Sequence, residues 1–325
     1  MRVLVSGAGG FLGRSVVDQL LKHGHEVRAI VRQTSTDIAW TEKVELFRAD
    51  LRTHQLIAAF ANIDAVIHVA AATSGSEDVQ FSSSVVGTER FLDAMAQSTV
   101  KRLVHVSSFV VYDWSRAVSV LDEETPLLTD IYNMGGYTIA KVWQERIVRE
   151  VAAAHGWDLT IMRPGFIWGP EHAEIAGMGR RLGRTYVMFG PFTRLPLSHV
   201  TNCAHSLVTA LESRAAIGET FNVVDGDDIR VWRYVREHAR RTGQQAILLP
   251  VPYFVGSLTS SIASWASRLL FGGKGKLPSL LIPRRFESQF KPIRFSNQKL
   301  GTKLSWSPPL SFDACLDATY RSEQA

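Results

Sequence analysis

The sequence predicts an α/β fold, a doubly wound parallel sheet with a second, smaller and mostly helical lobe. Two observations lead to this prediction. Over residues 1–165, short apolar runs alternate with longer amphipathic ones, as strands and helices do around a parallel sheet. Beyond residue 165, Pro and Gly become frequent and the alternation is lost, which indicates the edge of a domain.

Each apolar run predicts a strand, and each amphipathic run between two of them predicts a helix. The expected strands are residues 2–6, 26–31, 44–48, 65–69, 102–107 and 158–162. The expected helices lie near residues 13–23, 52–60, 81–97 and 136–155. A further helix and strand within 197–224 are expected to return to the same sheet. The expected domains are residues 1–165 plus 197–224, and a substrate-binding lobe of residues 166–196 plus 225–325.

Composition and charge exclude several classes of protein. Hydrophobic residues make up 46% of the chain and charged residues 21%, as in ordinary globular proteins. The net charge of +5 lacks the dense Lys/Arg block of a nucleic-acid-binding arm. No apolar run reaches the roughly 18 residues of a membrane span. Two cysteines, Cys203 and Cys315, are too few for a disulfide framework, so we expect a cytoplasmic protein. From the charge distribution we expect no nucleic-acid partner, and the expected ligand is a small molecule.

A glycine-rich turn, GAGGFLG, follows the first expected strand and opens the first expected helix. Its glycines suit a tight turn in which the backbone approaches a pyrophosphate and the helix packs on the sheet. The start of that helix offers unpaired N–H groups and a positive dipole end to phosphates. A tight turn without a ligand is the alternative. The context is that of a Rossmann fold, which predicts a dinucleotide site at Gly7, Gly10, Phe11, Leu12 and Gly13.

The end of the second expected strand, EVRAIVRQ, predicts which dinucleotide binds. Folds that prefer NAD carry an acidic residue here for the ribose 2′-OH, whereas this chain has Val31 and Arg32. A guanidinium pairs well with a 2′-phosphate, so NADP is the expected cofactor, with NAD as the alternative. A plain surface charge is the competing interpretation of Arg32, and Arg28 is a weaker second candidate. Asp50 is expected to accept from the adenine amino group or to cap a helix.

Tyr137 and Lys141 stand four residues apart in YTIAK, which places them on one helix face. A lysine ammonium lowers the pKa of a nearby tyrosine, which can then exchange a proton with a carbinol or carbonyl oxygen during hydride transfer. Ser108, at the end of LVHVSS, could hold the same oxygen by a hydrogen bond. These three residues are the predicted catalytic set. No metal site is predicted, because the histidines lack Cys or carboxylate neighbours at ligand spacing.

With these motifs in this order, the sequence resembles the extended short-chain dehydrogenase/reductase superfamily, often called the NAD-dependent epimerase/dehydratase family. The resemblance covers nearly the whole chain, from GAGGFLG through ADL, HVAA, VGTERFLDA, VSSFVVYD, YTIAK and RPGFIWGP to PLSHVTNCA. It implies that Ser108, Tyr137 and Lys141 are catalytic and that Lys141 also binds the nicotinamide ribose. It further implies cofactor contacts within the ADL, HVAA and RPGFIWGP motifs, at Leu51, Ala70, Ala71 and Pro164.

Three departures from the family pattern narrow the expected reaction. Sugar-nucleotide dehydratases of the family carry an Asp-Glu pair after the catalytic Ser/Thr, where this chain has Phe109 and Val110, so dehydration is not expected. The Asn that contacts the diphosphate in many epimerases is replaced by Phe166, and a second family Asn by Ser84. RPGFIWGP is similar to the version in 3β-hydroxysteroid dehydrogenase-like relatives. We expect an oxidoreductase acting on a secondary alcohol or ketone; a sugar-nucleotide epimerase and a non-catalytic dinucleotide sensor are the alternatives.

Two segments concern partners. Residues 251–271 show helical amphipathicity, with apolar residues opposite a serine-rich face, and basic residues follow. This segment is expected to pack on the lobe, to cover an apolar substrate, or to make a weak contact with a membrane surface. By the family resemblance, a homodimer is expected through the helices near 81–97 and 136–155. Its predicted contact residues are Phe91, Leu92, Met95, Val142, Ile147 and Val151.

Overall fold

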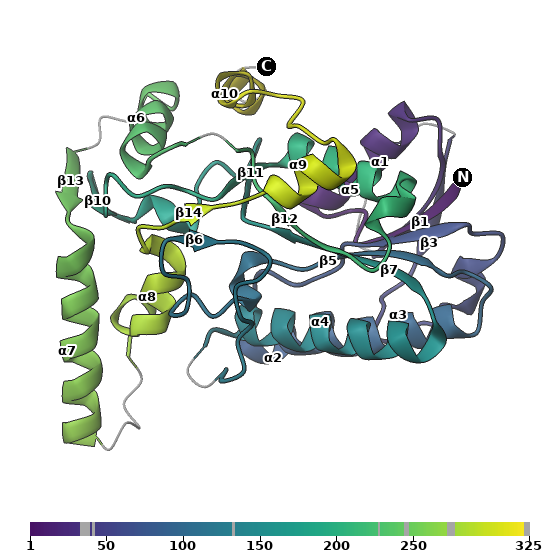
Figure 1. The fold of residues 1–325 in the computed structure, drawn as a ribbon, viewed down its shortest axis with the longest axis horizontal. Helices are drawn as coiled ribbons and strands as arrows, with labels where there is room; N and C mark the ends of the chain where they lie inside the picture. The colour runs from purple at the N-terminus through teal and green to yellow at the C-terminus, as the bar shows by residue number, and fades with distance from the viewer. Residues whose placement is uncertain are drawn as a thin grey trace.

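A seven-stranded parallel sheet dominates the computed structural model, which describes residues 1–32, 40, 43–131, 134–226, 228–243, 247–271 and 277–321 (Figure 1). From edge to edge the strands are β12 (Thr220–Val223), β7 (Asp158–Pro164), β5 (Arg102–Val106), β4 (Ala65–His68), β1 (Arg2–Ser6), β2 (Glu26–Val31) and β3 (Val44–Arg48). Every neighbouring pair is parallel. The strand order changes direction between β1 and β4, which confirms the predicted doubly wound fold.

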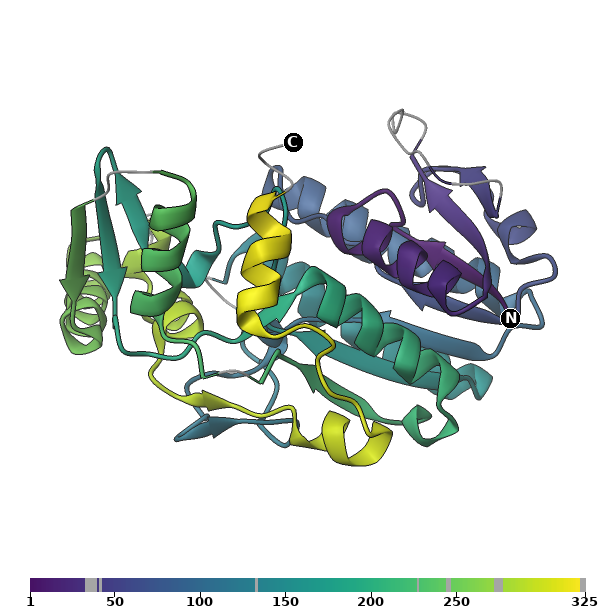
Figure 2. The same cartoon turned by 90° about the horizontal axis from the view of Figure 1, so that it is seen from above.

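Helices cover both faces of this sheet (Figure 2). The helices that flank it are α1 (Phe11–Lys22), α3 (Gly87–Ala96), α4 (Gly136–His155) and α5 (Val200–Glu212). On one face, Val16 of α1 and Leu207 of α5 join the strands in an apolar core. On the other face, Phe91 of α3 and Val148 of α4 do the same. Because both faces are covered, the central strands read as continuous apolar runs in the sequence.

This core uses the apolar residues that the sequence assigned to a contact between two copies. Phe91, Leu92 and Met95 of α3 are fully buried within the chain, and Val142 of α4 is nearly so. The assignment of these four residues to a dimer contact is therefore wrong: Phe91, Leu92 and Met95 pack in the layer between α3, α4 and the sheet, and Val142 packs with Val111 and Leu128. Ile147 and Val151 are half-buried, and their role in a dimer stays a prediction. The exposed large apolar side chains on this side are Val79, Phe81, Val86 and Trp143.

The helix expected over 52–60 is also wrong, since only a 3₁₀ turn, Ile57–Phe60, forms there. The buried Arg28 guanidinium donates to the carbonyls of Ala59 and Ala61, at 2.8 and 2.9 Å. A side chain from β2 thus satisfies backbone groups that a longer helix would have paired internally. The segment therefore remains a capped turn.

The helix expected over 81–97 begins earlier and is interrupted. It consists of α2 (Glu77–Phe81), a π-helical turn (Ser82–Val86) and α3. Ser84, at a position where family members carry Asn, lies inside the π-helical turn and is buried. Such turns occur mostly as local bulges, frequently at functional sites, and this one contacts α4 at Gln144.

The lobe combines helices with three small sheets. Its elements are β6 (Val120–Leu121), β8 (Phe166–Trp168), β9 (Arg180–Leu182), β10 (Thr185–Phe189), β11 (Leu197–His199), β13 (Ile247–Val251), β14 (Arg294–Phe295), α6 (Val231–Arg241), α7 (Tyr253–Phe271), α8 (Pro283–Phe290) and α10 (Phe312–Arg321). α9 (Gln298–Leu304) instead packs on the main sheet beside β12, where Leu300 joins the core. Its core surrounds the buried Trp168, whose ring lies 5.3 Å from Tyr234 and 5.8 Å from Phe312 between centroids. β12 returns to the main sheet beside β7, whereas the exact domain division stays a prediction.

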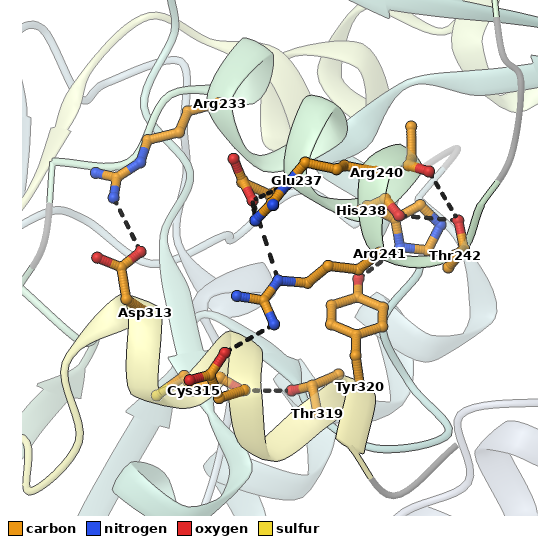
Figure 3. A network of polar contacts seen from close by, with 12 residues as sticks. Arg233, Glu237, His238, Arg240, Arg241, Thr242, Asp313, Cys315, Thr319 and Tyr320 are labelled. Carbon is orange, nitrogen blue, oxygen red and sulfur yellow. Dashed lines mark hydrogen bonds and ion pairs between the residues drawn. The ribbon is translucent and has the colours of Figure 1, made fainter. Parts of the chain in front are cut away.

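A polar network joins α10 to α6 (Figure 3). Arg233 pairs with Asp313 at 3.2 Å, and Arg241 pairs with Asp317 at 2.8 Å. The buried His238 lies 2.7 Å from the Tyr320 hydroxyl between Nδ1 and O. These contacts attach the last helix to the lobe.

Within the described part of the chain, no helix has the length and hydropathy needed to cross a bilayer.

Candidate active site

The predicted site residues lie along one edge of the main sheet, in the order of its strands. Because the strands are parallel, their carboxyl ends meet at this edge. Pro164 ends β7, Ser108 follows β5, Ala70 and Ala71 follow β4, Gly7 follows β1, Arg32 follows β2 and Asp50 follows β3. An extended ligand along this edge would reach Arg32 at one end and Ser108 at the other.

The turn from β1 to α1 requires glycine at two positions. Gly7 has a φ of +69°, and a Cβ there would lie 2.7 Å from the Cα of Ala70. A Cβ on Gly13 would lie 2.1 Å from the Gly7 carbonyl oxygen, so α1 packs closely on the turn. Gly10, the N-cap of α1, provides no side-chain hydrogen bond to the first turn of the helix. The start of α1 is therefore open to an anionic group.

The next two predicted cofactor residues direct their side chains elsewhere. Phe11 stacks on His172 of the lobe with ring centroids 4.1 Å apart. Leu12 belongs to the apolar core. A phosphate contact from either residue would therefore come from its backbone N–H.

The end of β2 carries the residue predicted to favour NADP. Val31 is buried, and Arg32 is exposed at the carboxyl edge. Arg28, the second candidate, donates to the backbone carbonyls after β3, and its Nε lies 2.9 Å from Oε2 of Glu45. Arg28 thus has a structural role, and Arg32 stays the predicted partner of a 2′-phosphate.

Asp50 is held by a basic neighbour that the sequence prediction did not include. The Arg52 side chain donates to both carboxylate oxygens of Asp50, at 3.1 and 2.8 Å, and its backbone N–H donates at 2.9 Å. The hydrogen bonds from Arg52 hold the pKa of Asp50 at about 2 although partial burial opposes them. The adenine contact predicted for Asp50 would share this carboxylate with Arg52. Leu51 is half-buried next to it.

Ser108 and Tyr137 are brought together by the end of β5 and the first turn of α4. Burial raises the pKa of Tyr137, and the neighbouring Ser108 hydroxyl opposes that rise. The backbone N–H of Val110 also donates to the Ser108 oxygen, at 3.4 Å. Ser108 thus caps the 3₁₀ turn Phe109–Val111 that follows β5.

Lys141 lies one turn further along α4 and is almost completely buried. Its Nζ donates to the Val106 carbonyl and to Oε1 of Gln144, each at 2.8 Å. Burial lowers the pKa of Lys141 to about 7, although Glu145 opposes this. The sequence predicts that Lys141 lowers the pKa of Tyr137, but in the structure burial raises this pKa and Ser108, not Lys141, opposes the rise. The Lys141 ammonium is directed at Val106 and Gln144 instead.

Gln144 is a site residue that sequence reasoning missed. It is fully buried, and its Nε2 donates to the Ala70 carbonyl at 2.9 Å and to Oγ1 of Thr88 at 2.7 Å. A longer contact of 3.4 Å reaches the Ser84 carbonyl in the π-helical turn. Since these acceptors orient the amide nitrogen, its oxygen must face Lys141. Gln144 therefore links the lysine to β4 and α3.

A buried chain of hydrogen bonds continues from Thr88 to the end of β1. His68 Nε2 lies 2.8 Å from Oγ1 of Thr88, and its Nδ1 lies 2.6 Å from Oγ of Ser6. Burial, with a contribution from Lys141, lowers the pKa of His68 to about 3, so the ring is neutral. No cluster of three metal-ligating side chains occurs among the residues that the structure describes.

A buried ion pair fixes α4 to the sheet beside the site. The Arg163 guanidinium on β7 donates through Nε to Oε2 of Glu145 at 3.1 Å, and Ser107 donates to the same oxygen. Burial favours the neutral acid, but Arg163 more than offsets it and lowers the pKa of Glu145. The signal that could have found Gln144 and Glu145 is two adjacent polar residues, three and four positions after Lys141, on the buried face of an amphipathic helix.

An open helix start at a glycine turn, with a serine, tyrosine and lysine further along the same edge, defines a dinucleotide-dependent enzyme of the short-chain dehydrogenase/reductase type. The model of the NAD dependent epimerase/dehydratase family matches residues 3–224. The chain belongs to this family, which confirms the resemblance predicted from its motifs. It is thus an NAD(P)-dependent enzyme, and both oxidoreductase and epimerase activities fit its relatives.

Individual relatives cover most of the chain. A 4-hydroxy-2-methyl-3-oxo-4-farnesyl-3,4-dihydroquinoline-1-oxide ketoreductase of Stigmatella aurantiaca is 29% identical over 264 residues, or 78% of this chain and 77% of the relative. A 3 beta-hydroxysteroid dehydrogenase/Delta 5→4-isomerase of Mycobacterium tuberculosis is 30% identical over 328 residues, or 94% and 86%. A UDP-glucuronic acid 4-epimerase from Bacillus cereus, solved in complex with NAD, shares the fold with a TM-score of 0.74 at 18% identity, covering 100% of this chain and 99% of that one.

Proposed function

We propose that this protein is an NADP(H)-dependent oxidoreductase that interconverts a ketone and a secondary alcohol. One observation carries the proposal: Ser108 after β5 neighbours Tyr137 in the first turn of α4, at the carboxyl edge of the sheet and one helical turn from the buried Lys141. The relatives named as a ketoreductase and a hydroxysteroid dehydrogenase support the same chemistry.

The residues along the edge fit a dinucleotide. The open start of α1 and the close approach of Gly7 to Ala70 leave backbone N–H groups for a pyrophosphate, and Arg32 would pair with a 2′-phosphate. Lys141 would bind the nicotinamide ribose, with Ala71 and Pro164 lining the path. When bound, the nicotinamide supplies or accepts the hydride.

Tyr137 is the proposed proton-transfer group. In the reducing direction its phenolic proton goes to the carbonyl oxygen as the carbon receives hydride, and Ser108 donates a hydrogen bond to that oxygen. Burial raises the pKa of Tyr137, which keeps the phenol protonated for this step. In the oxidising direction the phenol must first lose its proton, and the Ser108 hydroxyl favours that loss.

Gln144 is the proposed positioning residue for Lys141. Its amide nitrogen is bound by Ala70 and Thr88, so its oxygen accepts from the lysine Nζ in one fixed orientation. This contact also favours the charged form of a lysine whose pKa burial has lowered to about 7. Gln144 therefore acts on the reaction through Lys141.

An apolar substrate fits the residues that replace polar ones in this family. Phe109 is buried directly after Ser108, and Phe166 is half-buried at the start of β8, where its ring packs near Gly177. Neither side chain offers a hydrogen bond to a diphosphate. We infer that the substrate is an apolar ketone or alcohol rather than a nucleotide sugar.

The Tyr137→Phe variant tests the mechanism. We expect turnover with NADPH and an apolar ketone to fall by about 10²- to 10⁴-fold, because only the proton-transfer hydroxyl is lost. NADPH binding, measured by calorimetry, should stay within about twofold of the parent protein, since the cofactor contacts remain. Retention of most of the activity would contradict the assigned mechanism.

A sugar-nucleotide epimerase that retains its cofactor is the second candidate, because structural neighbours of this chain include such enzymes. The two functions differ in what is consumed. An oxidoreductase uses one NADP(H) per product, whereas an epimerase leaves its bound cofactor unchanged over a full cycle. The amount of NADPH oxidised per product formed distinguishes them.

Two further proposals concern the state of the protein. We propose a homodimer through the exposed side chains of α2 to α4, among them Phe81 and Trp143, and light scattering at micromolar concentration would show a monomer if this is wrong. We also propose a cytoplasmic location, because Cys203 and Cys315 are both buried free thiols.

A further inference from the structure

Helix α7 presents its apolar face outward and its small residues inward. The outward residues recur at helical spacing, and Leu258, Trp265 and Leu269 are 59%, 65% and 69% exposed. The exposed apolar face of α7, its apolar stripe, consists of Phe254, Leu258, Ile262, Trp265 and Leu269. A soluble helix normally buries such a face, so this arrangement requires a reason.

The orientation of α7 is fixed by close packing on its other side. A Cβ on Gly256 would lie 2.3 Å from the Phe286 ring of α8 and 3.0 Å from the Phe189 ring of β10. Ser260 and Ser267 are buried on the same side, and Ser260 satisfies its hydroxyl within the helix through the Ser257 carbonyl. Rotation of α7 to bury the stripe would place larger side chains where only glycine and serine fit. The packing of Gly256 thus holds the apolar stripe outward in this structure.

The stripe lies at the outer boundary of the lobe. Figure 1 shows α7 standing at the end of the molecule opposite the N-terminus, with α8 between it and the main sheet. Strand β13 leads directly into α7, and its Ile247 and Leu249 are exposed as well. The apolar surface thus continues from β13 along the whole helix.

The segment that carries the stripe has basic residues and no acidic ones, although acidic residues of other elements lie beside two of the basic residues: Asp130 beside Arg284 and Glu77 beside Arg285. Residues 247–286 contain no Asp or Glu, whereas five basic residues occur among them: Arg268, Lys274, Lys276, Arg284 and Arg285. Lys274 and Lys276 lie outside the described residues, and Arg284 pairs with Asp130 at 2.9 Å. This stretch carries a charge of +5, which equals the net charge of the whole chain. The other residues of the chain sum to a net charge of zero.

We propose that α7 docks on the surface of an anionic lipid bilayer, with its apolar stripe in the headgroup region and its basic residues at the lipid phosphates. An apolar face that includes aromatic residues, here Phe254 and Trp265, and has basic residues nearby is typical of a helix that lies in the bilayer interface. A second copy of this chain is a weaker candidate occupant, because two such surfaces would repel each other. The proposal does not depend on the reaction that the enzyme catalyses.

Binding to vesicles tests the proposal with the full chain. We expect the protein to sediment with vesicles that contain about 30% phosphatidylglycerol at least tenfold more than with pure phosphatidylcholine vesicles, and salt should reduce this binding. The double variant Ile262→Ser with Trp265→Ser should lose it. Phe192→Ser, which removes an exposed aromatic of the lobe outside α7, is the matched control and should bind like the parent protein.

Charge reversal gives a second arm. Arg268→Glu should weaken binding to the anionic vesicles and leave any weak binding to neutral vesicles unchanged. The proposal is overturned if the parent protein ignores both vesicles or if the double variant binds as well as Phe192→Ser. It is also overturned if light scattering shows a dimer that the double variant dissociates, because a second copy would then occupy the stripe. Activity in the absence of lipid confirms that each variant is folded.

Discussion

Helices α4 and α7 both depart from the usual pattern of apolar residues inside and polar residues outside, and they do so in opposite ways. On α4, Lys141, Gln144 and Glu145 are buried against the sheet. On α7, Phe254 and Trp265 are exposed. The two helices differ in their partners. These buried polar groups of α4 have hydrogen-bonded partners inside the chain, whereas no described residue covers the apolar stripe of α7.

The comparison shows two ways in which a helix becomes functional. A polar residue inside the protein is stable only when its hydrogen bonds are satisfied, so the network around α4 must form as a unit. An apolar residue on the surface needs no partner inside the protein. The free-energy cost of exposing it to water is removed only when another molecule covers it. Substitutions in α4 should therefore affect stability and catalysis, and substitutions in the α7 stripe should affect neither in solution.

The largest expected effect is on stability. Arg163→Met leaves the buried Glu145 carboxylate without its main partner, and we expect the free energy of unfolding to fall by about 3–5 kcal/mol. Trp265→Ser on the exposed stripe should change it by less than about 0.5 kcal/mol. Urea denaturation of both variants provides the measurement. Equal losses of stability in the two variants would show that the apolar stripe contributes to the folded core, which would contradict the difference between α4 and α7.

The pH dependence of stability tests the burial of Lys141. Its pKa in the ligand-free protein is about 7, well below its ordinary value, so between these two pH values the unfolded chain binds the extra proton. Stability should therefore rise with pH above 7, by about 2 kcal/mol between pH 7 and 9, relative to Lys141→Met, which lacks this group. A constant difference between the two proteins over this range would mean that Lys141 stays charged inside the fold.

Opposite substitutions of Gln144 separate positioning from packing. Gln144→Leu removes the oxygen that accepts from Lys141, and kcat should fall by about tenfold with the pKa of Lys141 displaced downward. Gln144→Glu places a carboxylate there and should displace the same pKa upward. The pH profile of kcat reports both displacements. Shifts in the same direction would show that Gln144 only fills space.

The smallest expected effect concerns cofactor choice at an exposed position. Arg32→Ala should weaken NADPH binding by about tenfold and leave NADH binding nearly unchanged, because screening limits an exposed guanidinium–phosphate pair. Arg52→Ala at the neighbouring strand end is the matched control, since Arg52 is engaged by Asp50. Titration calorimetry with both cofactors decides. If Arg52→Ala produces the selective loss, the 2′-phosphate partner is Arg52.

Residues of the sheet edge could be predicted from the sequence because each depends on local order alone. Gly7 and Gly13 are required by a turn between two adjacent elements. Tyr137 and Lys141 share a face because of the period of a single helix. Gln144 escaped prediction because its partners come from β4, α3 and the π-helical turn, which are distant in the sequence. The orientation of α7 escaped for a related reason, since helical spacing shows which face is apolar and not which face meets the protein.

The Gly256–Phe286 contact also has a consequence for the solubility of this protein and for its adsorption to surfaces. Because the packing of Gly256 on Phe286 holds the apolar stripe outward, every folded molecule exposes this stripe. Molecules kept at low salt would be separated by their shared positive charge, and concentrated salt would remove that separation. The protein should consequently adsorb to plastic and precipitate early on salting out, and small amounts of mild detergent should keep it dispersed.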